Sequence, residues 1–172
     1  HPIGGSIDSK GNLWVTDAGT GNNDASVVMI NPAGEKTTFV EGLPSILANG
    51  SIEGISHPLI QGNTLFFLHG ISGMLYKADV SSFAKGSAAV ALTSLQSEDV
   101  KTYINSQNLV DPVNSNAYDL AVGPDNDIFF TDAGSNAVIR RKNDGTLSVF
   151  AKIPNIADQT EAVPTGITYD GD

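Results

Sequence analysis

Acidic and imidazole side chains stand at matching points of a repeated sequence. Asp17 lies near the end of residues 11–19, and Asp132 holds the same place in the similar stretch 126–134. A weaker copy between them has His69 there. Such groups at the ends of neighbouring strands could form an oxygen-rich site for a cation or ligand. Each Asp could instead accept backbone N–H bonds within its own turn, and we favour this interpretation because repeated motif residues tend to maintain the repeat.

A polar loop follows the first of these stretches. Asn22, Asn23 and Asp24 offer side-chain oxygens, which are the ligands that hard cations prefer. The spacing does not match an EF-hand, and Asn and Asp are also the usual residues of Asx turns in glycine-rich loops. We therefore favour a structural role for these three residues over a cation site.

Hairpin register predicts two further pairs of titratable groups. If the third repeat turns near residues 125–126, Asp119 lies almost opposite Asp132, and two close carboxylates would raise one pKa or attract a cation. The same hairpin register in the middle repeat brings His57 and His69 to one end of a hairpin, where two imidazoles could bind a transition metal. Metal sites usually need more than two ligands, so we favour isolated, hydrogen-bonded histidines.

The sequence lacks the short motifs of common nucleophilic and phosphate-binding sites. It contains no G-x-S-x-G, H-E-x-x-H, P-loop or G-x-G-x-x-G pattern. It has no cysteine, which excludes disulfides, thiolate zinc sites and cysteine nucleophiles. The net charge of −10 disfavours nucleic acid and anionic lipid and favours cationic or neutral ligands. No apolar run reaches the ~20 residues of a membrane span, so we expect no membrane insertion.

Short β-branched or aromatic runs, bounded by Gly, Asn, Asp and Pro, must position these groups. Each outer repeat predicts four strands, and Asn143-Asp144-Gly145 is a strong hairpin signal. In the middle repeat, residues 97–104 predict a short capped helix, inserted between blades. The predicted strands are residues 3–8, 13–17, 26–31 and 36–41 in the first repeat, 64–69 and 74–79 in the middle one after a start near Ile55, and 118–123, 128–132, 137–142 and 146–151 in the third.

Four antiparallel strands in each repeat of ~40–50 residues predict an all-β fold of β-propeller blades. We expect one partial propeller: blade 1 at 1–50, blade 2 with its insertion at 51–115, blade 3 at 116–160 and the first strand of a fourth at 161–172. Unpaired edges of such an array favour pairing with a second copy of the chain. In a propeller, the loops after the second and fourth strands of each blade share one face, which is the natural binding surface. We expect that face to carry Asp17, Asn22, Asn23, Asp24, Glu53, His69, Asn116, Asp132, Asn136 and Glu161, with Asp119 near Asp132.

Several segments resemble the ScyD/ScyE family of NHL-like propeller proteins, within the wider gluconolactonase-like group. The resemblance runs through the whole chain and implies an exported bacterial protein without an established biochemical activity, of which this chain is roughly the first half. Asp119 departs from the family, which more often has Asn there. The matching segments are residues 16–24 (TDAGTGNND), 81–83 (SSF), 116–118 (NAY), 131–141 (TDAGSNAVIRR) and 163–167 (VPTGI).

Together these observations favour a ligand- or protein-binding propeller without catalysis of its own, in an extracellular or periplasmic location. The alternative is a Ca²⁺-dependent hydrolase of the gluconolactonase type, as the resemblance to that wider group implies. In that case Glu53 and Asn116 are the expected metal ligands, together with groups outside this sequence.

Overall fold

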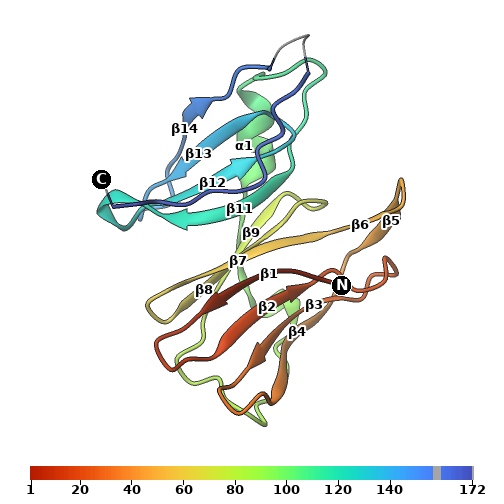
Figure 1. Ribbon diagram of the computed structural model, residues 1–172, viewed down its shortest axis with the longest axis vertical. Coiled ribbons are helices and arrows are strands. Elements are labelled where there is room, and N and C mark those ends of the chain that lie inside the picture. Colours follow the sequence, from red (N-terminus) through yellow and green to blue (C-terminus); the bar gives the residue numbers. More distant parts are fainter. Residues whose placement is uncertain (157–159, 172) are drawn as a thin grey trace. The chain divides into compact units, whose positions relative to one another are not determined.

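The computed structural model describes residues 1–156 and 160–171, which form mainly antiparallel sheets (Figure 1). The first sheet has the order β1-β2-β3-β4 and confirms the four strands predicted for the first repeat, with shifts of a few residues at their ends. Its strands are β1 (Pro2–Ile7), β2 (Leu13–Asp17), β3 (Ala25–Ile30) and β4 (Lys36–Leu43).

The second sheet has the order β10-β9-β8-β7 and is also a complete four-stranded blade. The helix predicted within 97–104 is confirmed only in part. Gln96–Asp99 is strand β10, because it pairs with β9, and α1 begins at Val100. Asp99 caps this helix by accepting the Thr102 N–H at 2.9 Å. The remaining elements here are β7 (Ile55–Gln61), β8 (Thr64–His69), β9 (Met74–Asp79), the 3₁₀ turn η1 (Leu92–Ser94) and α1 (Val100–Ser106).

The third sheet has the order β11-β12-β13-β14 and follows the strands predicted for the third repeat. Asp144 accepts the Thr146 N–H at 2.8 Å, in the turn that the Asn-Asp-Gly sequence predicts. Residues 160–171 carry no strand in the structure, so the first strand of a fourth blade stays a prediction. The elements are β11 (Ala117–Val122), the 3₁₀ turn η2 (Pro124–Asn126), β12 (Ile128–Asp132), β13 (Ala137–Arg141) and β14 (Leu147–Lys152).

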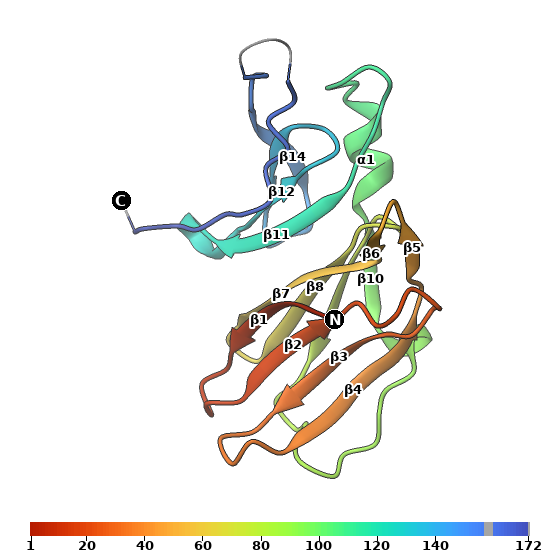
Figure 2. The ribbon, with the colours of Figure 1, turned by 45° about the vertical axis from the view of Figure 1, so that its right-hand side comes forward.

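A two-stranded hairpin that was not predicted follows the first sheet, formed by β5 (Ile46–Ala48) and β6 (Ser51–Glu53) (Figure 2). Asn49 and Gly50 make its turn with φ values of 50° and 82°, the left-handed geometry of tight hairpins. An isolated bridge between Asn22 and Ile46 joins β5 to the loop after β2.

The chain divides into two compact units, unit 1 at His1–Glu98 and unit 2 at Asp99–Asp172. Unit 1 contains the first two blades, which share a core around Trp14. The Trp14 ring meets Phe39 at 5.4 Å and Phe83 at 5.7 Å between centroids, so an aromatic residue from the β9–β10 connection seals blade 1. No helix among the described residues is long and apolar enough to cross a bilayer.

Candidate functional site

The predicted site residues fall in both units. Unit 1 holds Asp17, Asn22, Asn23, Asp24, Glu53 and His69, and unit 2 holds Asn116, Asp119, Asp132, Asn136 and Glu161. In unit 1 most of them lie on one surface, made by residues 18–24 and 44–54, which we call the loop platform.

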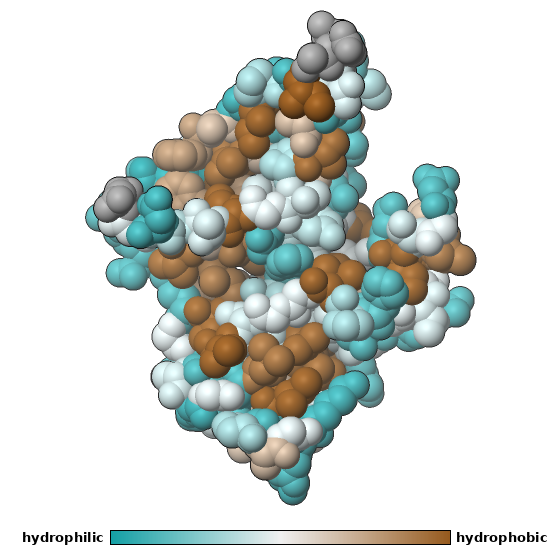
Figure 3. All heavy atoms as spheres, in the orientation of Figure 1, coloured by the Kyte–Doolittle hydropathy of each residue, from teal (hydrophilic) through white to brown (hydrophobic). Residues whose placement is uncertain are grey.

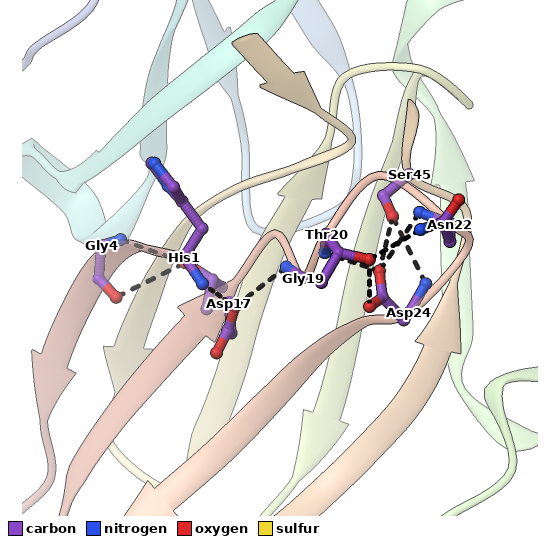
Figure 4. Close-up of polar contacts among 9 residues, drawn as sticks. His1, Gly4, Asp17, Gly19, Thr20, Asn22, Asp24 and Ser45 are labelled. Atoms are coloured by element: carbon purple, nitrogen blue, oxygen red, sulfur yellow. Dashed lines mark hydrogen bonds and ion pairs between the residues drawn. The ribbon is translucent and has the colours of Figure 1, made fainter. Parts of the chain in front are cut away.

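Asp24 is the centre of the loop platform (Figure 4). Its carboxylate accepts the Thr20 N–H and hydroxyl, both at 2.8 Å, and the Ser45 hydroxyl at 3.2 Å. The Asn22 N–H adds a longer contact of 3.4 Å. The two Thr20 donors are the main reason why the pKa of Asp24 falls from 3.8 to about 2. The carboxylate therefore stays ionised and is committed to shaping the loop.

Ser45 joins the loop after β2 to the segment after β4. Its N–H donates to the Asn23 side-chain oxygen at 3.2 Å, and its carbonyl accepts the Asn23 N–H at 3.2 Å. Asn23 has φ of 58°, a left-handed conformation that Asn tolerates better than most residues. Asn23 thus serves as a structural clamp for the buried Ser45, as the favoured interpretation of this loop predicts.

Asp17 closes a turn at the end of β2. Its Oδ1 accepts the Gly19 N–H at 2.9 Å and the amino group of His1 at 2.6 Å. The hydrogen bond from that amino group is the main cause of the lowered pKa of Asp17. The Gly19 contact is that of a carboxylate that shapes its own turn.

His69 ends β8 at the place that Asp17 has in blade 1, and it is buried. Its Nε2 lies 2.9 Å from the Pro44 carbonyl oxygen and its Nδ1 lies 2.8 Å from the Ser72 hydroxyl. Burial lowers the pKa of the imidazole, so it stays neutral at pH 7. Both ring nitrogens of His69 are therefore engaged. His57 packs against Gly4 instead, so closely that a Cβ added to Gly4 would come within 2.8 Å of the His57 ring. The two histidines therefore do not form a metal pair.

Asp132, the counterpart of Asp17 in unit 2, is completely buried. Its carboxylate accepts the Ser115 hydroxyl and the Ser135 N–H, each at 2.7 Å. These bonds join the entry of β11 to the turn after β12. Because a buried carboxylate is stable only when its oxygens are satisfied, Ser115 and Ser135 are essential partners of Asp132.

Asp119 does not lie opposite Asp132, so the expected carboxylate pair is wrong. The residue opposite Asp132 is Ala117, because a register shift separates Ala117 from Leu120. The Asp119 carboxylate instead accepts the N–H groups of Leu120 at 2.9 Å and Ile167 at 3.0 Å. A bulge at this point could not be derived from the hydrophobic alternation of the strand.

Asn136 and Asn116 also hold the chain in unit 2. The Asn136 side chain accepts the Val163 N–H at 2.9 Å, and its φ of 52° explains why Asn suits this turn. The Asn116 carbonyl accepts the Ala133 N–H at 2.9 Å.

The two expected calcium ligands do not make a centre within either unit. Glu53 is exposed in β6 of unit 1, opposite Ile46, whereas Asn116 is half-buried in unit 2. Within residues 1–156 and 160–171, no three carboxylate or imidazole groups gather closely enough to hold a metal ion.

Sequence reasoning missed a cleft in unit 2. It has a volume of about 470 Å³ and is lined by one face of β11–β14 together with residues 167–169. Phe129 and Phe150 meet there at 4.9 Å between centroids, and the Arg140 guanidinium lies 5.7 Å from the Phe129 ring. Asp127 holds Arg140 through contacts of 2.6 Å to Nε and 2.5 Å to a terminal nitrogen. The available signal was the matching position of Trp14 and Phe129 in the repeated stretches 11–19 and 126–134.

No protein-family model matches this chain, and no curated protein matches it. Solved structures do resemble it. A catalytically inactive virginiamycin B lyase from Staphylococcus aureus, with quinupristin, has a TM-score of 0.58 and 19% identity over 95% of this chain and 44% of its own. A streptogramin B lyase has a TM-score of 0.57 and 14% identity over 93% of this chain and 42% of its own.

A luciferin-regenerating enzyme is similar at a TM-score of 0.57 and 11% identity, over 88% of this chain and 46% of its own. This chain therefore spans less than half the length of these structures. At such identities the likeness concerns the fold alone. It identifies the four-stranded sheets of this chain as blades of a partial β-propeller.

Proposed function

We propose that this chain is a binding scaffold without catalysis of its own, in which the loop platform of unit 1 receives a neutral or cationic ligand or protein partner. One observation carries the proposal: the strand-end carboxylates are already used to hold loops. Asp24 accepts from Thr20, Asn22 and Ser45, and a hydrolytic site would need such groups free to hold a cation or to move a proton.

The exposed side of the loop platform offers binding chemistry. Thr20, Asn22 and Glu53 are exposed and bring hydroxyl, amide and carboxylate groups. On the β5–β6 hairpin, Ile46 and Leu47 are 47% and 66% exposed, which adds an apolar contact beside the polar ones. The net charge of −10 favours a cationic or neutral ligand over an anionic one.

We further propose that the chain belongs to the ScyD/ScyE family and is exported from a bacterial cell. This part of the proposal is supported only by the sequence segments that resemble that family. The competing function is a calcium-dependent hydrolase of the gluconolactonase type. It keeps some support because several structural neighbours are enzymes by name. It lacks a set of ligands that come together within one unit, since Glu53 and Asn116 lie in different units.

The proposal is tested by NMR titration of the whole chain with a lysine-rich peptide and, separately, a glutamate-rich peptide. We expect shifts confined to residues 18–24 and 44–54 with the lysine-rich peptide alone, and weaker binding by Glu53→Gln. Asp144→Asn, an exposed acid in the β13–β14 turn, is the matched control and should bind like the unmodified chain. Shifts spread over the acidic surface, or calcium-dependent hydrolysis of gluconolactone that Glu53→Gln abolishes, would contradict the proposal.

A further inference from the structure

The aromatic pair in the unit 2 cleft has a counterpart in unit 1. Both sheets have the same register: Thr16 pairs with Val27 and Val27 with Val40, as Thr131 pairs with Val138 and Val138 with Ala151. A register shift follows in β4 and in β14 at the same point, so Phe39 corresponds to Phe150 and Trp14 to Phe129. The two pairs share an edge-to-face geometry, with interplanar angles of 81° and 84°.

These two equivalent pairs differ in what covers them. In unit 1, Phe83 packs on both Trp14 and Phe39, and blade 2 lies beyond it, so that both rings are almost fully buried. In unit 2, Phe150 is 62% exposed and borders the open cleft. Phe129 is itself buried, but an exposed Phe150 on a sheet face whose equivalent is a blade interface marks a docking surface for another blade.

The side of blade 2 that covers blade 1 also has a counterpart. It consists of aliphatic and aromatic residues of β7, β8 and β9 that pack in the shared core. By strand register they correspond to residues of β1, β2 and β3 on the opposite side of blade 1. The blade 2 residues are Ile60, Leu65, Phe67, Tyr76 and Ala78, and their counterparts, which we call the blade 1 outer face, are Ile7, Leu13, Val15, Val28 and Ile30.

The blade 1 outer face is apolar and partly open to solvent. Ile7 is 69% exposed and Leu13 is 36% exposed, and Figure 3 shows an apolar patch over β1 and β2 of unit 1. Among the described residues, unit 1 thus presents one half of a repeating interface and unit 2 the other, with Ile7 and Phe150 exposed. The Ile7 and Leu13 side chains here have the positions of Ile60 and Leu65 in the interface that is formed.

We propose that two copies of this chain associate head to tail, with the blade 1 outer face of one copy packed on the Phe129–Phe150 face of the other. Val163 is bonded to Asn136 in the β12–β13 turn and Ile167 to Asp119 in β11, so we place the second copy on the Phe150 side of the cleft. A second copy fits this face because its blade 1 outer face is, by strand register, the equivalent of the blade 2 side that already packs on the matching aromatic pair in unit 1. The inference does not depend on the proposed function.

The contact joins two different surfaces, so two variants that are each damaged in a different surface should still associate with each other. A contact between two identical surfaces would not allow this. The experiment is light scattering of the whole chain over a range of concentrations, with Ile7→Asp, Phe150→Asp and an equimolar mixture of the two. Each substitution places a charge in one half of the contact. Val113→Asp, in the α1–β11 connection and 45% exposed, is the matched control.

We expect the unmodified chain and Val113→Asp to show the mass of two or more copies. Ile7→Asp alone and Phe150→Asp alone should each show the mass of one copy. The mixture should recover a two-copy mass, because Phe129 and Phe150 of the Ile7→Asp chain remain free to bind the intact blade 1 outer face of the other. Circular dichroism of each variant establishes that it is folded. A single-copy mass for the unmodified chain at every concentration would overturn the proposal, as would disruption by only one of the two substitutions.

Discussion

Removing the Asp132 carboxylate tests whether the strand-end acids hold the fold or serve a ligand. In Asp132→Ala, the Ser115 hydroxyl and the Ser135 N–H each lose a 2.7 Å acceptor in a buried place. An unsatisfied buried donor costs about 1–3 kcal/mol, and two would cost about 2–6 kcal/mol. Part of this is offset because the variant no longer buries a charge, so we expect a loss of about 3 kcal/mol in the free energy of unfolding.

The assay is urea unfolding of the whole chain followed by far-ultraviolet circular dichroism, with hydrogen exchange of the Ser135 amide as a local readout. Asp17→Ala is the matched control, because Asp17 has the same place in the repeat but a partly exposed side chain, and it should cost less than about 1 kcal/mol. Residues that serve a ligand are often neutral or stabilising when removed. An unchanged or increased stability of Asp132→Ala, with the Ser135 amide still protected, would refute the structural role.

Three further predictions follow from the packing and the ionised side chains. Because the pKa of Asp24 is lowered to about 2, its ionised carboxylate stabilises the fold at pH values above 3.8, and this contribution disappears as the pH falls through about 2. The melting temperatures of the unmodified chain and Asp24→Asn should therefore differ at pH 7 and converge toward pH 2. A difference that stays constant with pH would contradict this. Phe83→Ala should lower the free energy of unfolding by about 3–5 kcal/mol, measured by Trp14 fluorescence. Phe150→Ala should have little effect on the stability of the unassociated chain. Equal losses in the two variants would count against the comparison of the two aromatic pairs. Asp99→Ala should cost about 1 kcal/mol and reduce protection of the α1 amides in hydrogen exchange, since it removes the N-cap, while full protection would show that the cap is dispensable.

Much of the fold follows from the sequence because each strand carries its own local signals. Runs of β-branched and aromatic residues between turn residues placed three blades, and the Asn-Asp-Gly turn fixed the β13–β14 hairpin. Strand β10 could not be found in this way. It pairs with β9 only after the connection that holds Phe83 and η1, so its assignment depends on contacts distant in sequence.

The candidate site was less predictable, for two physical reasons. Asp17 and Asp132 have the same sequence context, yet one is partly exposed and the other is buried, because burial depends on the packing of each unit. The bulge between Ala117 and Leu120 moved Asp119 out of register with Asp132. Ser45 has no motif of its own, and its role emerges from hydrogen bonds with Asn23 and Asp24. The Asn49-Gly50 turn was the available signal for the β5–β6 hairpin.

The most direct test of the account is a calcium titration of the whole chain followed by NMR, because it asks whether the acidic loops are clamps or ligands. Calcium chloride is raised beyond the ~10⁻³ M at which weak extracellular calcium sites fill. The account predicts no saturable shifts at Asp24, Glu53 or Asn116 beyond those that magnesium chloride produces at equal ionic strength. Saturable, calcium-specific shifts at these residues would contradict it and would favour the calcium-dependent hydrolase.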